Sequence, residues 1–240
     1  HSLMGQQVTT AALVIGCIPY GDKSQILKLW TRSLGLQAYM LYSSRGKSAV
    51  IKPSMLMPMT ALQCEVTFRN KGQLERVKDA TAMPRWEVLQ SNPMKQAFCM
   101  FLSEVLLKTL RDGESTEAFF DEMMDLLMAI DQGEQAMDSA ALKALLIMTQ
   151  HMGFGIDPRF HQPTMVYDLK EGCFCFPPMT HHEGISAADC QTLINWMRDE
   201  SHPMDGATKS RLVDALLSTL RLHHPNMAPI KSLDILRSLT

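Results

Sequence analysis

The chain has 240 residues, of which 46% are hydrophobic and 20% are charged. This composition argues against extended disorder. No apolar run reaches the ~18 residues that a membrane-spanning helix needs, so we expect a soluble protein without a secretory signal. The net charge of −2 conceals an asymmetry, because residues 1–80 hold ten Lys and Arg against four Asp and Glu, whereas residues 81–240 hold thirteen against twenty-one. A basic first part predicts an anionic partner for it.

Six cysteines occur in the chain, at positions 17, 64, 99, 173, 175 and 190. Most lie within apolar patterns, which favours buried, reduced thiols in a cytoplasmic protein over a disulfide framework. The 19 methionines fall mostly at helix-spaced positions, where this flexible side chain fills gaps in a core.

Short runs rich in Val, Ile, Thr and aromatic residues fill the first 80 residues. Turn signals such as Pro19-Tyr20-Gly21-Asp22 and Asn70-Lys71-Gly72 separate them. Five strands are predicted, over residues 8–18, 25–31, 36–43, 60–69 and 73–80. Five short strands in about 75 residues fit a small barrel, closed or partly open.

Helical periodicity takes over after a linker at residues 81–92. Asn92 is expected to cap the first helix, with Pro93 at its first position. Further helices are predicted from Ser115, over 139–152, over 187–199, over 207–222 and over 232–239. A short hairpin turning at Glu171-Gly172 is predicted within an irregular insertion at 154–184. The fold class is therefore α+β with several domains: a barrel at 1–80, the linker, and a helical domain at 93–240.

Cations are spread over the predicted strands and loops of the barrel, and no acid interrupts residues 43–48. Neutralising phosphates needs many dispersed cations rather than one fixed geometry, so the barrel is a candidate nucleic-acid interface. The cations are Lys28, Arg32, Arg45, Lys47, Lys52, Arg69, Lys71, Arg76 and Lys78. Aromatic side chains that would stack on unpaired bases are Trp30, Tyr39, Tyr42 and Phe68. The alternative is a solvated charged face over an aromatic core.

A second candidate is a metal site formed by Cys173, Cys175, His181, His182 and Cys190. Structural zinc usually needs two Cys pairs with two to four residues between partners. Here one residue separates the first pair, and there is no second pair, so we predict no metal site and no cofactor.

Signals for an enzyme are weak. His181-His182-Glu183 lacks the His-Glu-x-x-His spacing, and there is neither a Gly-rich phosphate loop nor a Gly-x-Ser-x-Gly elbow. We therefore predict no catalytic residues and no enzyme activity.

Several stretches, taken in order, resemble the RecO family of recombinational repair proteins. They are the strand and turn at 9–24, Thr31-Arg32-Ser33-Leu34-Gly35, the basic loop Arg45-Gly46-Lys47-Ser48, and Pro58 ahead of Cys64-Glu65-Val66. The helical stretch 94–123 and the terminal 230–239 extend the resemblance over nearly the whole chain. No single motif is a catalytic fingerprint, but the order and spacing of the stretches are specific together.

The resemblance implies an N-terminal OB-fold, a helical domain and, in many members, a four-Cys zinc site, from which residues 173–190 depart. It also implies binding to single- and double-stranded DNA, annealing of complementary strands, and contact with RecR and with the C-terminal tail of single-strand-binding protein, so that RecA is loaded indirectly. The resemblance therefore also implies a cytoplasmic, nucleoid-associated protein that has no membrane partner.

The DNA-binding residues expected on this basis contact phosphates without reading sequence: Lys28, Arg32, Arg45, Lys47, Lys52, Arg69, Lys71 and Arg76. Gly46 and Ser48 would let the backbone approach phosphate beside Arg45 and Lys47. An acidic tail would need a basic spot on the helical domain, such as Arg111, Arg198 or Arg211. The alternative functions are a protein–protein adaptor that uses the barrel as a docking module, and a metal-dependent hydrolase at 173–190.

Overall fold

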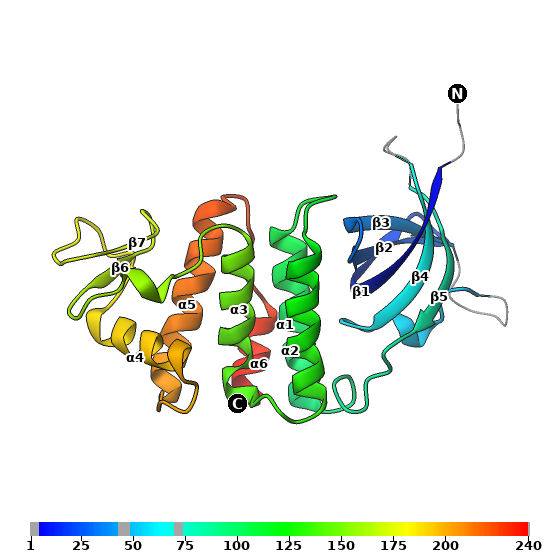
Figure 1. Cartoon of the computed structure of the whole chain (residues 1–240). Coiled ribbons are helices and arrows are strands. Elements are labelled where there is room, and N and C mark those ends of the chain that lie inside the picture. The colour runs from blue at the N-terminus through cyan, green and yellow to red at the C-terminus, as the bar shows by residue number, and fades with distance from the viewer. Residues whose placement is uncertain (1–4, 43–48, 70–73, 240) are drawn as a thin grey trace. The chain divides into compact units, whose positions relative to one another are not determined.

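The computed structural model describes residues 5–42, 49–69 and 74–239. The chain divides into two compact units, His1–Gln135 with Pro229–Thr240, and Ala136–Ala228 (Figure 1). The first unit contains β1 (Gln6–Tyr20), β2 (Ser24–Thr31), β3 (Gly35–Leu41), β4 (Ala61–Phe68), β5 (Val77–Ala82), α1 (Pro93–Thr109), α2 (Glu117–Asp131) and α6 (Ser232–Leu239). The second contains α3 (Ala140–His151), β6 (Val166–Asp168), β7 (Cys173–Cys175), β8 (Gly184–Ile185), α4 (Ala187–Arg198) and α5 (Gly206–His223).

The five strands of the first unit form an antiparallel sheet in the order β3-β2-β1-β4-β5. The long β1 pairs with β4 through its first half and with β2 through its second, with a register shift between Val14 and Gly16 that lets it turn from one partner to the other. The two edges then meet, because Tyr39 of β3 bridges Glu75 in parallel and the amide of Met40 donates to the Glu75 carbonyl at 2.9 Å. This closed five-stranded barrel confirms the predicted OB-fold.

Alternation along the strands fills the barrel with one continuous core. Its buried members include Val14, Leu29, Tyr39, Leu62 and Val66. The predicted strands are confirmed, except that the fifth begins at Val77 and ends at Ala82. Closure leaves few free strand edges, and the side chains available to a ligand are those on the outer face and the loops.

The barrel packs directly on α1 and α2. The buried Trp30 points outward from β2 and lies against Phe119 and Phe120, with ring centroids 4.6 and 5.4 Å away, and its indole N–H donates to Ser115 Oγ at 2.8 Å. A side chain at Gly16 would put its Cβ 2.9 Å from Leu107 of α1, so the bare glycine permits this close approach.

The predicted linker at 81–92 is held to α2 by one carboxylate. Asp131 accepts hydrogen bonds from the backbone N–H groups of Glu87, Val88 and Leu89 at 3.1, 2.9 and 2.8 Å. Burial alone would raise the pKa of Asp131, but these bonds and Lys95 outweigh it and lower the pKa. These hydrogen bonds therefore hold the segment against α2. The helices α1, α2 and α6 belong to the same compact unit as the barrel, and the remaining helices form the other unit. The domain boundaries expected at residues 80 and 93 stay a prediction.

Helix ends follow the sequence signals closely. Asn92 Oδ1 accepts from the amides of Met94 and Lys95 at 3.1 and 3.2 Å, with Pro93 first in the helix, as predicted. The second helix is capped by Thr116, whose hydroxyl accepts from Phe119 N, and not by Ser115, whose hydroxyl is used by Trp30.

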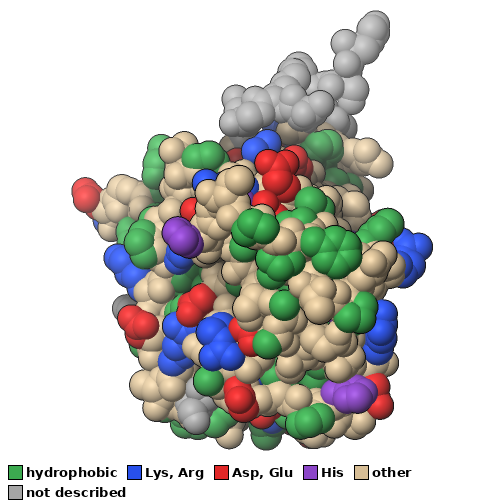
Figure 2. All heavy atoms as spheres, turned by 90° about the vertical axis from the view of Figure 1, so that its left-hand side faces the viewer, with side chains coloured by type: hydrophobic (Ala, Val, Ile, Leu, Met, Phe, Trp, Pro, Cys, Tyr) green, Lys and Arg blue, Asp and Glu red, His purple; other side chains and the backbone are tan. Residues whose placement is uncertain are grey.

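The second unit consists of three helices and a three-stranded sheet in the order β7-β6-β8. The predicted hairpin at Glu171-Gly172 is confirmed, with Gly172 at φ 66°. Ser186 caps α4 by accepting from Asp189 N, and Asp189 is bonded in turn by Arg211 of α5 at 2.8 and 3.1 Å. Figure 2 views the face on which β6, β7 and α4 lie, and there cationic, anionic and apolar side chains are interspersed. The described side chains of that face therefore form no broad patch of one sign.

Candidate nucleic-acid interface

Three of the eight expected DNA-binding residues, Arg45, Lys47 and Lys71, lie outside the described residues. Four of the other five divide between two regions of the barrel. Lys28 and Arg32 lie toward the helices of the first unit, whereas Arg69 and Arg76 flank the seam where β3 meets β5. Lys52 is exposed ahead of a 3-10 turn at Pro53–Leu56.

Acids of the same unit neutralise the helix-facing pair. Arg32 Nε and Nη2 donate to Asp121 of α2 at 2.7 and 2.9 Å, and Glu117 lies 3.2 Å from Nη1. The hydrogen bond to Arg32 holds the pKa of Asp121 below its ordinary value. Lys28 Nζ lies 3.4 Å from Asp112. A DNA role for these two cations stays a prediction, and the ion pairs weigh against it because phosphates would have to displace carboxylates.

The described cations of the barrel do not lie together on one surface. Arg32 directly follows β2 at the turn into β3, whereas Tyr42 directly follows the far end of β3. At ~3.3 Å per residue the two ends of this hairpin are roughly 25 Å apart. The cations beside Tyr42 therefore form a separate group.

The seam group consists of Arg69, Arg76 and Lys78. The Arg76 guanidinium lies over the ring of Tyr42, 4.0 Å from its centroid, and Arg69 Nε is 3.3 Å from Glu75. These residues line an open groove of about 620 Å³ with Gln7 and Thr67. Lys78 is exposed on β5, one residue after Val77 points into the core. Its exposure beside Arg76, on the lining of the same groove, adds it to the site.

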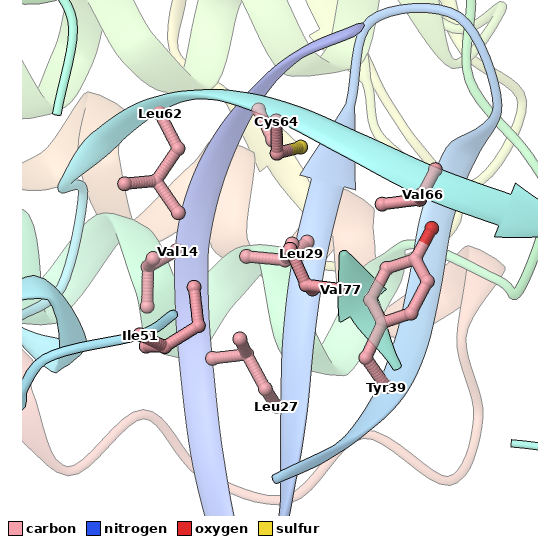
Figure 3. Packing of buried hydrophobic residues seen from close by; sticks show 10 residues of the cluster. Val14, Leu27, Leu29, Tyr39, Ile51, Leu62, Cys64, Val66 and Val77 are labelled. Atoms are coloured by element: carbon pink, nitrogen blue, oxygen red, sulfur yellow. The ribbon is translucent and has the colours of Figure 1, made fainter. Parts of the chain in front are cut away.

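A second hollow of about 270 Å³ opens between Tyr42, Arg76 and the barrel core. It is lined by Leu27, Tyr39 and Ile51, and Figure 3 shows these three side chains inside the barrel. The seam thus presents three cations and one acid, Glu75, beside an apolar hollow. The excess of positive charge suits a polyanion with attached rings.

The stacking prediction is wrong for two of its four aromatics. Tyr39 is 3% exposed within the core and Trp30 is fully buried against α2, because strand parity turns the first inward and the helices cover the second. Phe68 is half-buried at the end of β4, and Tyr42 is 54% exposed. Tyr20 is 55% exposed. The sequence does not mark it as a stacking residue, because it lies within the turn signal Pro19-Tyr20-Gly21-Asp22.

The cysteines and histidines of the second unit do not gather into a metal site. His181 Nε2 lies 3.0 Å from Asp168 Oδ2, and His181 Nδ1 accepts from Glu183 N, so both ring nitrogens are used. Cys190 is buried, and burial raises the pKa of its thiol to about 12. Metal binding needs thiolates, so this donor set does not fit zinc. Among the described residues, no three His, Cys, Asp or Glu side chains lie in an arrangement able to hold an ion.

Known proteins are similar to this chain both in the barrel of the first unit and over nearly its whole length. Residues 4–84 match the family model described as the N terminus of recombination protein O. A protein of Christiangramia forsetii is 30% identical over 174 residues, which cover 70% of each chain. The chain belongs to the RecO family.

Other relatives in the family align over nearly the full length. Those of Flavobacterium psychrophilum and Phocaeicola vulgatus are 28% and 23% identical, cover 97% and 96% of this chain, and span 99% and 98% of their own lengths. All three relatives carry the name DNA repair protein RecO. The chain is thus a DNA repair and recombination protein with an N-terminal OB-fold. No helix within the described ranges is long and apolar enough to cross a membrane.

Proposed function

We propose that this chain is a non-enzymatic recombination mediator that binds single- and double-stranded DNA through the phosphate backbone, anneals complementary strands and helps to load RecA onto strands covered by single-strand-binding protein. The observation that carries the proposal is the seam group, Arg69, Arg76 and Lys78, on an OB-fold of a family named for DNA repair. Backbone contacts of this kind position a strand without reading its sequence. Lys52 and, outside the described residues, Arg45, Lys47 and Lys71 are further cations that we propose to contact phosphates.

The test is the affinity of the full chain for a single strand and a duplex, measured by fluorescence anisotropy. Arg69→Gln/Arg76→Gln/Lys78→Gln should weaken binding to both by at least about tenfold, since three phosphate contacts are lost. A matched variant with the same charge change in the second unit, Arg159→Gln/Lys170→Gln/Arg221→Gln, should bind as the original chain does. Equal effects of the two variants would contradict the proposal.

Partner binding is a further part of the proposal, and the family resemblance supports it. Among the cations considered for the acidic tail of single-strand-binding protein, Arg211 borders a groove of about 600 Å³. Its guanidinium is bonded to Asp189, and Glu183 and Asp214 also line the groove, so the groove itself is net acidic. Arg198 donates to the Pro158 carbonyl at 3.4 Å, and Arg111 is exposed in the first unit.

Titrating the tail peptide into the full chain separates these sites. We expect one of three charge reversals to abolish binding of the tail peptide and the other two to leave it unchanged. The three variants are Arg111→Glu, Arg198→Glu and Arg211→Glu. If the peptide does not bind the original chain, the proposed contact with the tail of single-strand-binding protein is wrong. A RecR pull-down tests the other proposed partner independently.

The adaptor alternative predicts the reverse of the DNA experiment. An acidic protein partner would then hold the seam group, and excess non-specific DNA would fail to displace it. Displacement by DNA at low salt supports the mediator.

A further inference from the structure

The outer face of β1, β2 and β3 is divided into a covered half and an open half. Near the helices, Leu13, Trp30 and Leu36 form a row across the three strands and are all buried. In the next row, Gly16, Lys28 and Ala38, Leu107 closes over the glycine and Asp112 pairs with the lysine. Beyond this row the outward-facing residues of β1 are exposed.

The open half carries two further rows. Ile18, Ile26 and Met40 stand opposite one another in register. One step further, Tyr20 pairs with Ser24, and Tyr42 continues β3 beyond the pair of Gln25 and Leu41. Ile18 is 50% exposed, and both tyrosines are more than half exposed. Ser24, which lies between the two tyrosines, has a small side chain.

The spacing between the two tyrosines follows from sheet geometry. Neighbouring strands lie ~4.8 Å apart, so Tyr20 and Tyr42 stand roughly 10 Å from each other across β2. Arg76 covers Tyr42 with its planar guanidinium, and Lys23 lies in the turn beside Tyr20. Cations thus adjoin both aromatic positions, although Asp22 shares the turn with Lys23.

We infer that this open face is a stacking platform for the unpaired bases of a single strand, with Tyr20 and Tyr42 as its two base-contacting residues. The inference rests on the proposed DNA-binding function and adds a preference to it: cations at the seam hold phosphates of any DNA, whereas the tyrosines contact only bases that are not paired. Every base has an apolar face, so the platform is indifferent to sequence. An apolar protein surface would also fit the rows, but the adjoining Arg76 and Lys23 favour a polyanion.

The test uses the full chain and three probes of equal phosphate number: a deoxythymidine strand, an abasic strand of the same length, and a duplex. Tyr20→Ala/Tyr42→Ala should weaken binding to the deoxythymidine strand by about tenfold or more, and change binding to the abasic strand and the duplex by less than about twofold. Tyr20→Phe/Tyr42→Phe should bind all three probes as the original chain does, because the ring is retained.

Phe160→Ala is a matched control, since Phe160 is 68% exposed in the second unit. Thermal unfolding of each variant shows whether the barrel remains folded. If the alanine pair unfolds, Tyr20→Leu/Tyr42→Leu, which keeps an apolar side chain without a ring, tests the platform and should show the same selective loss on the deoxythymidine strand. Equal losses on deoxythymidine and abasic strands, or no loss on either, would overturn the platform while leaving backbone binding intact. Absence of binding to every probe by the original chain would overturn the proposed function and the platform together.

Discussion

Arg32 illustrates how a single cation can be read in two ways. On the sequence it belongs to a basic barrel, but in the structure it is bonded to Asp121, which lies 89 residues further along the chain. The geometry is that of a two-pronged arginine–carboxylate pair, which is specific in direction as well as in charge. In the structure this pair joins the end of β2 to α2, and it weighs against the predicted contact with DNA.

Arg32→Gln should therefore lower the unfolding temperature and leave the affinity for single-stranded DNA within about twofold of the original. Arg76→Gln should show the opposite pattern, because its guanidinium lies over Tyr42 and not on a carboxylate. Thermal unfolding and anisotropy on both variants give the comparison. If Arg32→Gln loses as much affinity as Arg76→Gln, the assignment of Arg32 to the helix contact is wrong.

At the scale of elements, α6 is held by a carboxylate from another helix. Glu104 of α1 accepts hydrogen bonds from the amides of Lys231 and Ser232 at 2.5 and 3.0 Å, and from Ser232 Oγ at 2.8 Å. Lys108 Nζ is bonded to it at 2.9 Å. Burial alone would raise the pKa of Glu104, but these donors lower it from 4.5 to about 2. Glu104 therefore acts as the N-terminal cap of α6.

This lowered pKa makes the cap dependent on pH. A carboxylate whose folded pKa lies below its unfolded pKa stabilises the protein above the unfolded value and loses that effect as the pH falls through the folded value. Glu104→Gln should cost up to about 3 kcal/mol of unfolding free energy at pH 7. The difference from the original chain should shrink between about pH 5 and pH 2.

Urea unfolding at several pH values measures this difference. The exposed Glu134→Gln serves as the control and should leave stability nearly unchanged throughout. A difference for Glu104→Gln that stays constant down to pH 3 would mean that its carboxylate does not carry the cap.

At the scale of the whole molecule, local patterns predicted most of the fold. Strand alternation, turn residues and the caps at Asn92 and Ser186 act over a few residues, so the sequence displays them directly. The pairings that decide the site span long separations. Lys28 and Arg32 pair with acids, and α2 covers Trp30, because of how the helices pack on the barrel. Composition and local patterns do not predict that packing.

The candidate site was predictable to the same extent. The basic character of the barrel and the exposed Tyr42 follow from the sequence, whereas Tyr20 was hidden in a turn signal and Tyr39 faces the core. Side chains alternate between the two faces of a strand, so Tyr20, two residues after the exposed Ile18, is expected on the same outer face of β1. The set of cations that share a surface could not be predicted, because it depends on how β3 closes on the segment that leads into β5.

The salt dependence of single-strand binding tests backbone recognition most directly. Each phosphate contact contributes about −0.7 to the slope of log affinity against log salt on a single strand, so the three seam cations alone give about −2. With Lys52, Arg45, Lys47 and Lys71 the slope approaches about −5. We expect a slope between these values for the original chain, and one shallower by about 2 for Arg69→Gln/Arg76→Gln/Lys78→Gln. A flat dependence, or equal slopes for the two proteins, would contradict a phosphate-binding surface at the seam of the barrel.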